Sequence, residues 1–363
     1  MLILGSQSKA RYELLKIYNA EIEVRVADID ESFDSSLSVE ENVQRVAYLK
    51  GQVLNQHLSK EDILICADTV CVKDGKVLTK VSSYQEAFDT LQSYSESDVQ
   101  VITGVYMVFD GKEVNFSQTS DISFSYFSDE KIKEYLNDVD YYLNIAGALA
   151  IEVIEKYVDY TYAGSFSNII GLPMEVITQL LFDRNILNHI DYSLEELLPI
   201  DYYRSSVRVF PIKDKQTYLL KCLTVDLKEE FYLSIGGGYH YFEDKTESLK
   251  KEAIEEAGMI LDKIQPLCNV VEYNRNVRIM PYNKLSTHAY YLGEITGYTE
   301  THYVDYEKDL LLGCVAFDIK DALELLEKQV KVFEDKAYPI ANISKCDLFA
   351  LQQLSKKVGI KDE

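Results

Sequence analysis

Residues 237–259 read GGYHYFEDKTESLKKEAIEEAGM, and this stretch decides the fold of the second half of the chain. Glu252, Glu255 and Glu256 follow one another at i, i+3 and i+4, so a helix places their carboxylates on one face. Like charges at this spacing repel and destabilise a helix unless a cation lies among them. Because oxygen ligands with room for water suit Mg²⁺ or Mn²⁺, the stretch predicts a divalent metal site.

The residues before this helix complete the pattern. Residues 236–238 are all glycine, which lets the backbone turn and approach a ligand closely, and Glu243 follows across the expected turn. The whole spacing resembles the Nudix box, G-x5-E-x7-R-E-U-x-E-E-x-G-U, in which U is an aliphatic residue. The matching residues are Gly237, Glu243, Glu252, Glu255, Glu256, Gly258 and Met259, with Ala253 at the first aliphatic position.

The resemblance implies a metal-dependent catalytic site. Its metal ligands would be Glu243, Glu252, Glu255 and Glu256; of these, Glu255 and Glu256 would be catalytic, and Gly237 would contact the substrate. Lys251 stands where the family has arginine, and it lacks the planar fork that can grip a carboxylate from two directions. The resemblance also implies an acidic base from a distal loop, for which the candidates are Glu294, Glu300 and Glu307. The alternative interpretation is a solvated acidic helix after a glycine turn.

Length and charge constrain the class of protein. At 363 residues the chain is long enough for two domains. The formal net charge of −23 argues against a broad nucleic-acid surface, although a local basic pocket with bound metal can still attract a nucleotide. The six cysteines form no CxxC pair, and no apolar stretch is long enough to span a bilayer. We therefore expect a cytoplasmic protein with reduced thiols and no membrane association.

Strand and helix patterns alternate along the chain. The opening MLILGS reads as a strand, a helix is expected from about Ser38, and residues 63–72, ILICADTVCV, read as a buried strand. We expect residues 1–183 to form a mixed α/β domain and residues 184–203, which are acidic and contain a proline, to form a linker. In residues 204–363 we expect strands through 207–226 and 231–237, then the box helix, strands near Val277 and Tyr290, and helices at 319–330 and 343–358. This order fits a Nudix-type α/β/α sandwich.

The first domain carries its own phosphate-binding groups. The stretch SQSKARYELL, residues 6–15, lies between a strand and a helix, where hydroxyls, backbone N–H groups and Arg11 favour anions. Other residues that can contribute to a phosphate-binding site are Lys50 on the second helix, Lys80 just after a strand, Asp68 at a strand end and Glu31 in an acidic loop. Cations that hold a triphosphate, together with carboxylates for metal and water, are what phosphoanhydride cleavage needs. Taken singly, each of these residues also fits a turn, a cap or a solvated surface position.

An ordered run of motifs in residues 1–181 resembles the Maf family of nucleoside triphosphate pyrophosphatases. The motifs are LILGSQS-x-x-R from Leu2, ADIDES from Ala27, RVAYLKG from Arg45, ADTV from Ala67, TGV from Thr103, SDEKIKEY from Ser128, AGA from Ala146 and SNIIGLP from Ser167. The resemblance implies hydrolysis of a nucleoside triphosphate to monophosphate and pyrophosphate with a divalent metal. Asp68 would be the general base or water-orienting carboxylate, with Glu31 assisting. The phosphates would be held by Ser6, Ser8, Arg11, Lys50 and Lys80.

Three departures from this family's pattern bear on the first half. The family reads S-x-S-P-R-R, whereas Lys9 and Ala10 stand at the proline and the first arginine. The family's K-A-G-A-Y-G-I-Q is IAGALAIE in residues 145–152, so a lysine becomes Ile145, an aromatic ring is lost and an amide becomes Glu152. The family's G-K-P is TKV in residues 79–81. Substrate choice and activity of this half are therefore an open question.

These patterns support one main hypothesis and two alternatives. In the main hypothesis, both halves hydrolyse phosphoanhydride bonds of nucleotides by metal-assisted attack of water. The second half would act on a nucleoside diphosphate linked to another group or on a modified nucleotide. In the first alternative only the Nudix-like half is catalytic and the Maf-like half binds or scaffolds; in the second, the protein is a non-enzymatic nucleotide sensor. The five histidines show no ligand spacing and receive no role, and a homodimer is left open.

Overall fold

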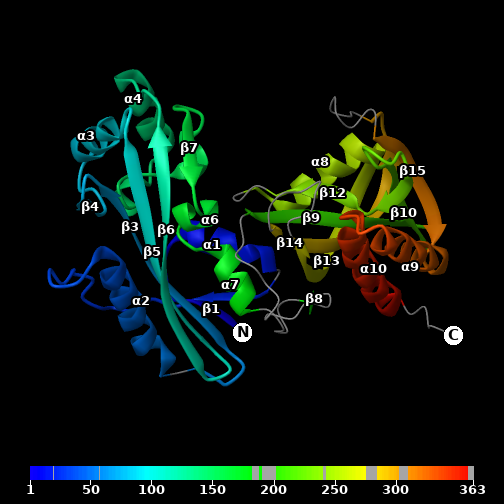
Figure 1. The fold of residues 1–363 in the computed structure, drawn as a ribbon, viewed down its shortest axis with the longest axis horizontal. Helices are drawn as coiled ribbons and strands as arrows, with labels where there is room; N and C mark the ends of the chain where they lie inside the picture. The colour runs from blue at the N-terminus through cyan, green and yellow to red at the C-terminus, as the bar shows by residue number, and fades with distance from the viewer. Residues whose placement is uncertain are drawn as a thin grey trace. The chain divides into compact units, whose positions relative to one another are not determined.

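The computed structural model describes residues 1–18, 20–56, 58–181, 188–189, 202–239, 243–274, 284–301 and 310–358. The chain divides into two compact units: residues 1–16 with 20–178, and residues 17–19 with 179–363 (Figure 1). Each unit is built on its own sheet, so each is described by itself. Most of the predicted linker, 184–203, lies outside the described residues.

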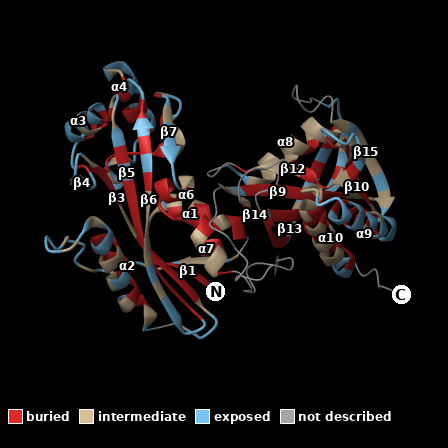
Figure 2. Ribbon diagram, viewed as in Figure 1, coloured by how far each residue is buried: buried red, intermediate tan, exposed pale blue. Residues whose placement is uncertain are grey.

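The first unit is built on one mixed sheet. Its strand order is β2-β1-β3-β5-β6-β7, with β4 paired to β3; β1 pairs in parallel with β2 and β3, and the remaining described pairs are antiparallel. The strands are β1 (Leu2–Leu4), β2 (Ile22–Val24), β3 (Ile63–Lys73), β4 (Lys76–Leu78), β5 (Asp98–Phe109), β6 (Lys112–Phe124) and β7 (Tyr160–Ala163). Figure 2 shows β3 and β5 buried over much of their length, as predicted for residues 63–72.

Helix α2 positions one of the predicted site residues. It begins after Ser38, as predicted, because Ser38 and Glu41 form a capping box in which each side chain accepts from the other's backbone N–H. Its apolar side, including Ala47, packs on β3 and β5, and Lys50 lies on the same buried side. The helices of residues 1–181 are α1 (Lys9–Leu15), η1 (Lys16–Tyr18), α2 (Val39–Asn55), α3 (Tyr84–Tyr94), α4 (Asp129–Asp138), η2 (Tyr142–Asn144), α5 (Ile151–Ile154), α6 (Phe166–Ile170) and α7 (Met174–Leu180).

The second unit is built on a sheet with more strands than the first, and this sheet also combines parallel and antiparallel pairs. Its order is β11-β10-β9-β14-β13-β8, with β12 paired to β9 and β15 paired to β10; β9 runs parallel to β14, and β12 runs antiparallel to β9. The strands are β8 (Asn188–His189), β9 (Tyr202–Lys213), β10 (Gln216–Leu223), β11 (Glu230–Leu233), β12 (Ile235–Gly238), β13 (Met259–Asn274), β14 (Lys284–Tyr298) and β15 (Leu311–Asp318). The helices are α8 (Lys245–Ala257), α9 (Ile319–Asp335) and α10 (Ile340–Lys357).

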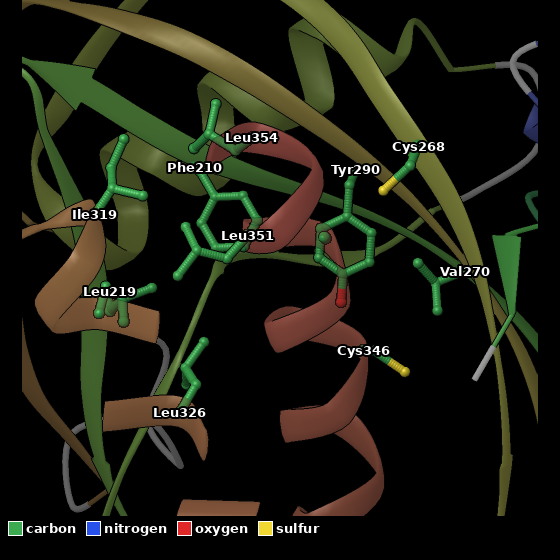
Figure 3. Close-up of a cluster of buried hydrophobic side chains, with 12 residues drawn as sticks. Phe210, Leu219, Cys268, Val270, Tyr290, Ile319, Leu326, Cys346, Leu351 and Leu354 are labelled. Carbon is green, nitrogen blue, oxygen red and sulfur yellow. The ribbon is translucent and has the colours of Figure 1, made fainter. Parts of the chain in front are cut away.

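Helices cover both faces of this second sheet. Successive residues of a strand point to opposite faces, and Gly237 of β12 faces Glu252 of α8, whereas Phe210 of β9 packs against Leu351 of α10. Figure 3 shows that second face, where Phe210 and Tyr290 stack at 5.9 Å between ring centroids beside the leucines of α10. This arrangement confirms the predicted α/β/α sandwich, and together the two units confirm the predicted α/β class.

Several local predictions differ from the structure. Residues 236–238 form strand β12 rather than a turn, because their backbone pairs with β9, and Gly236 has a positive φ of 144°. Asp68 lies in the middle of β3, not at a strand end, because the ladder between β3 and β5 continues through it to Val72. Val277 lies outside the described residues, and the strand before that position is β13.

Two expectations about the whole chain can be compared with the described residues. All six cysteines are free, and Cys314 is less buried than the others. Among the described residues, no helix combines the length and apolar character needed to cross a bilayer.

Candidate functional site

In the first unit, two predicted carboxylates converge on one predicted cation. The ammonium Nζ of Lys50 lies 2.9 Å from Glu31 Oε1 and 3.0 Å from Asp68 Oδ1. Lys50 comes from the buried side of α2, Asp68 from β3 and Glu31 from the loop before α2. The exposed fraction of the side chain is 51% for Glu31 and 15% for Asp68. The two carboxylates therefore extend from the surface of the unit into its interior.

Arg11, predicted to hold phosphate, is largely occupied by the protein. Its buried guanidinium donates to Ala67 O (2.9 Å), Gly171 O (3.0 Å), Ser6 Oγ (3.0 Å) and Thr69 Oγ1 (2.7 Å). A guanidinium has five N–H donors, so these bonds leave little capacity for a ligand. Burial lowers the pKa of Arg11, while Asp68 and Glu31 counteract that effect. In this arrangement Arg11 joins the loop before α1 to β3 and to the loop after α6.

The two predicted serines lie beside Arg11. Ser6 Oγ accepts from the Ser8 N–H at 3.2 Å, and Ser8 Oγ accepts from the Arg11 N–H at 3.3 Å, which caps α1. The remaining predicted cation, Lys80, is exposed, and its backbone forms an isolated antiparallel bridge with Ala146. This bridge places Lys80 next to the 145–152 segment, whose departures from the family pattern were noted above.

Sequence reasoning missed a chain of hydroxyls behind Asp68. Thr69 Oγ1 lies 3.0 Å from Thr103 Oγ1, and the Thr103 hydroxyl donates to Asn168 O at 3.2 Å. The side-chain amide of Asn168 in turn donates to Val101 O at 3.1 Å. Thr69, Thr103 and Asn168 each fall inside a motif quoted above. The motifs therefore already marked these residues in the sequence, although no role was predicted for them.

In the second unit, two of the four box glutamates point to the glycine strand. A Cβ added to Gly237 would lie 2.1 Å from Glu252 Oε1, so only glycine leaves room for that carboxylate. The neighbouring Gly236 N–H donates to Glu256 Oε2 at 3.1 Å. Glu252 and Glu256, one turn apart on α8, thus both face β12 and contact adjacent glycines, as expected of residues at i and i+4 on one helix face.

The other two box glutamates have separate partners. Glu255, of which 35% is exposed, forms a loose ion pair of 3.9 Å with Lys251, the residue that replaces the family's arginine. Glu243 accepts from the Ser248 hydroxyl at 3.0 Å. Within the described ranges, no three His, Cys, Asp or Glu side chains gather closely enough to hold a metal ion. The donor chemistry of Glu252 and Glu256 nevertheless suits a hard cation such as Mg²⁺.

Two of the three candidate distal bases can be located. Glu294 forms an ion pair of 2.6 Å with Lys263, and both side chains are exposed. Glu300 is exposed as well, whereas Glu307 lies outside the described residues. Among the residues that the structure describes, neither Glu294 nor Glu300 forms a hydrogen bond or ion pair with the box helix, so the geometry selects no distal base.

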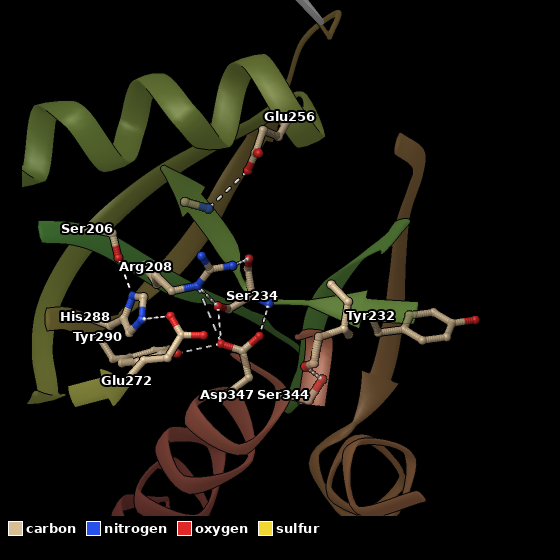
Figure 4. Close-up of polar contacts among 12 residues, drawn as sticks. Ser206, Arg208, Tyr232, Ser234, Glu256, Glu272, His288, Tyr290, Ser344 and Asp347 are labelled. Carbon is tan, nitrogen blue, oxygen red and sulfur yellow. Dashed lines mark hydrogen bonds and ion pairs between the residues drawn. The ribbon is translucent and has the colours of Figure 1, made fainter. Parts of the chain in front are cut away.

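A buried polar network on the α10 face was not anticipated from the sequence (Figure 4). Asp347, fully buried on α10, accepts from the Ser234 N–H (2.8 Å), the Ser234 hydroxyl (2.7 Å) and the Tyr290 hydroxyl (2.7 Å). Arg208 donates to Ser234 Oγ and O at 2.6 and 2.7 Å. Since Ser234 immediately precedes β12, this network ties α10 to the glycine strand that receives Glu256.

The sheet, the carboxylates at Lys50 and the buried arginine define the first unit as an α/β unit with a cluster of charged groups from α1, α2, β3 and the loop before α2. The family described as Maf-like protein matches residues 1–184, and the chain belongs to this family. A dTTP/UTP pyrophosphatase from Caldicellulosiruptor bescii is 37% identical over 179 residues, which is 48% of this chain and 89% of that protein. A dTTP/UTP pyrophosphatase from Thermosipho africanus is 30% identical over 187 residues, 52% of this chain and 95% of that protein.

Solved structures give a second, weaker likeness. A NUDIX hydrolase from Nitrosomonas europaea aligns over 44% of this chain and 96% of its own, with a TM-score of 0.30 and 10% identity. An ADP compounds hydrolase aligns over 43% of this chain and 75% of its own, with a TM-score of 0.30 and 19% identity. With values this low, the assignment of the second unit rests on its own motif and contacts.

Proposed function

We propose that the protein is a nucleotide hydrolase with two catalytic units, each of which breaks a phosphoanhydride bond by attack of water. The observation that carries the proposal is similar in both units: two carboxylates contact one short part of the fold. In the first unit Glu31 and Asp68 both contact Lys50, and in the second Glu252 and Glu256 contact the adjacent glycines 237 and 236 of β12. Carboxylates so placed can orient and deprotonate water.

The first unit would cleave a nucleoside triphosphate to monophosphate and pyrophosphate. Thymidine and uridine triphosphates are the first substrates to test, because the similar proteins from two bacteria are named dTTP/UTP pyrophosphatases. Asp68 would orient the attacking water, Glu31 would assist, and Lys50 would hold both carboxylates in place while offering positive charge to phosphate. Ser6, Ser8 and Lys80 would contact the phosphates, with Arg11 acting mainly to position the loops around them.

The second unit would cleave a nucleoside diphosphate linked to another group, or a modified nucleotide. Glu252 and Glu256 would hold a divalent cation together with Glu255 and Glu243 once those two side chains turn from Lys251 and Ser248. Mg²⁺ or Mn²⁺, when bound, would neutralise phosphate charge and lower the pKa of a bound water. Gly237, which lacks a side chain, lets both carboxylate and substrate approach the backbone of β12.

A panel of nucleotides tests the first unit. Full-length protein with Mg²⁺ or Mn²⁺ should release pyrophosphate from at least one nucleoside triphosphate, and Asp68→Asn should reduce that rate by roughly 10²–10⁴-fold. The exposed Asp74→Asn, in the turn between β3 and β4, is the matched control and should leave the rate unchanged. Equal rates in wild type and Asp68→Asn would remove Asp68 from the mechanism.

A second candidate function keeps catalysis in the second unit only, with the first unit binding nucleotide. Two observations favour it: Arg11 is occupied by protein acceptors, and Ala10 and Ile145 stand where the family has cations. Saturable binding of a triphosphate, with no pyrophosphate released across the panel, would support this candidate. Its second unit would still hydrolyse a diphosphate-linked nucleotide.

A further inference from the structure

A second group of polar side chains shares the α10 face of the second sheet with the Asp347 network. In the sheet register Ser286 of β14 lies between Arg204 of β9 and Glu272 of β13, and His288 lies beside Ser206. Because residues paired across a sheet point to the same side, these side chains form one patch. We name it the basic cluster; its members are Arg204, Ser206, Glu272, Lys284, Ser286 and His288.

Part of the basic cluster is satisfied internally. The Ser206 hydroxyl and His288 Nδ1 lie 2.5 Å apart, and His288 Nε2 lies 3.1 Å from Glu272 Oε2 (Figure 4). Lys284 Nζ is 3.9 Å from the same carboxylate oxygen, which is a loose ion pair. The row from Ser206 through His288 to Glu272 is thus buried and hydrogen-bonded, and the pairing with Glu272 is the one ion pair or hydrogen bond of the Lys284 ammonium within the described ranges.

Ser286 stands out because its hydroxyl is buried without a partner. The residue has no exposed surface, and its Oγ makes no hydrogen bond in the described part of the chain. Buried hydroxyls are nearly always hydrogen-bonded, because leaving one unpaired costs about 1–3 kcal/mol. A buried hydroxyl that the described residues leave unpaired, with Arg204 and Glu272 as its register neighbours on the adjacent strands, is therefore a candidate ligand contact.

The charge of this neighbourhood favours an anion. Arg208 is paired with Asp347 at 3.5 Å, so the charges left in the basic cluster itself are the cations Arg204 and Lys284 and one carboxylate, Glu272. Burial lowers the pKa of His288, which favours its neutral form. Burial also lowers the pKa of Lys284, while Glu272 opposes that effect. In a chain with a net charge of −23 this small positive excess, carried by the exposed Arg204 and the partly buried Lys284, is a local exception.

The basic cluster adjoins the glycine strand from the opposite side to the box helix. A Cβ on Gly238 would lie 3.0 Å from Arg204 Nη2, whereas a Cβ on Gly237 would meet Glu252 on the α8 side. Consecutive glycines of β12 therefore separate the carboxylates from the basic cluster. The Glu252 carboxylate and the Arg204 guanidinium thus lie beside neighbouring glycines of β12, on opposite faces of the strand.

We propose that Arg204, Lys284 and Ser286 bind an oxyanion, a phosphate or carboxylate, on the group that the diphosphate of the substrate carries. Arg204 offers the planar fork that matches an oxyanion, Lys284 adds a second charge, and the Ser286 hydroxyl donates the hydrogen bond it lacks in the free protein. The identification of this oxyanion as part of the substrate rests on the proposed function of the second unit. The presence of an oxyanion-binding site does not depend on that function.

Calorimetric titration of the full-length protein tests the site without hydrolysis. Inorganic phosphate and, separately, acetate are titrated in the presence of a chelator, which keeps divalent metal out. At least one anion should bind saturably, and Arg204→Gln and Ser286→Ala should each weaken a binding event by about tenfold or more. Lys215→Gln removes the same charge from the exposed turn after β9 and should leave every isotherm unchanged. The anion that binds more tightly shows whether the site prefers a phosphate or a carboxylate.

The outcomes separate this inference from the proposed function. The inference would be overturned if neither anion bound saturably. It would also be overturned if the isotherms of Arg204→Gln and Ser286→Ala superimposed on that of the wild type. Binding that both variants lose, in a protein that hydrolyses no nucleotide, would leave the site intact and reject the proposed function. If the experiments support both the binding site and the proposed function, Arg204→Gln and Ser286→Ala should raise KM and leave kcat unchanged. The substrate for this measurement is a diphosphate-linked nucleotide whose attached group carries the more tightly bound oxyanion.

Discussion

Replacing Gly237 with alanine separates the position of one proposed metal-binding carboxylate, that of Glu252, from the stability of the fold. The new Cβ would lie 2.1 Å from Glu252 Oε1 and 2.7 Å from Glu252 Cδ, where ordinary contact requires about 3.4 Å. The obstacle is the far end of a flexible side chain, and the backbone of Gly237 needs no positive φ. We therefore expect Gly237→Ala to fold, with the Glu252 carboxylate displaced by about 1 Å.

A displacement of that size is large for catalysis. A misplacement of about 1 Å in a reacting group can cost roughly 10²-fold in rate, or about 2.7 kcal/mol of transition-state stabilisation. The assay is turnover of a panel of diphosphate-linked and modified nucleotides by full-length protein with Mg²⁺, with thermal unfolding measured in parallel. Gly293→Ala is the matched control, because its Cβ would meet Leu261, Val209 and Ile264 at an ordinary 3.4–3.5 Å. Wild-type turnover in Gly237→Ala would refute the assignment of Glu252 to the site.

Three further predictions follow from single contacts. Lys50→Met leaves Glu31 and Asp68 without their shared cation, so it should lower the free energy of unfolding by about 1–3 kcal/mol and abolish any pyrophosphate release, which denaturant titration and product assays measure. Burial raises the pKa of Glu152, so its contribution to stability is complete below pH 4.5 and falls as pH rises through the folded-state pKa; Glu152→Gln should therefore gain Tm relative to wild type at pH 8 but not at pH 4. An unchanged difference in Tm between the two pH values would contradict this sign. Ser286→Ala removes an unpaired buried hydroxyl and should raise the free energy of unfolding by about 1 kcal/mol while weakening anion binding; a loss of stability would mean that the hydroxyl has a partner.

Local patterns predicted the elements that carry the site. The Ser38 cap and the apolar periodicity after it predicted α2, and the buried face of that helix places Lys50 over β3. The i, i+4 spacing of Glu252 and Glu256 predicted two carboxylates on one side of α8, which the structure shows at β12. Helical periodicity and capping depend on residues a few positions apart, so a single sequence contains them.

Contacts between distant segments were not predictable in the same way. Arg11 looks like a free cation in the sequence, but Gly171, 160 residues away, accepts one of its hydrogen bonds. Residues 236–238 read as a turn, and only pairing with β9 makes them a strand. His288 has no ligand spacing along the chain, yet Ser206 and Glu272 come to its two ring nitrogens from neighbouring strands. Such contacts depend on strand register, which the hydrophobic pattern of one strand does not specify alone.

The central claim is that each unit hydrolyses its own nucleotide with its own pair of carboxylates. The most direct test measures both activities of full-length protein in two variants, Asp68→Asn and Glu256→Gln, across one panel with Mg²⁺ and product identification. We predict that Asp68→Asn loses pyrophosphate release from triphosphates and keeps cleavage of a diphosphate-linked nucleotide, and that Glu256→Gln does the reverse. Wild-type rates for both activities in both variants would contradict the account.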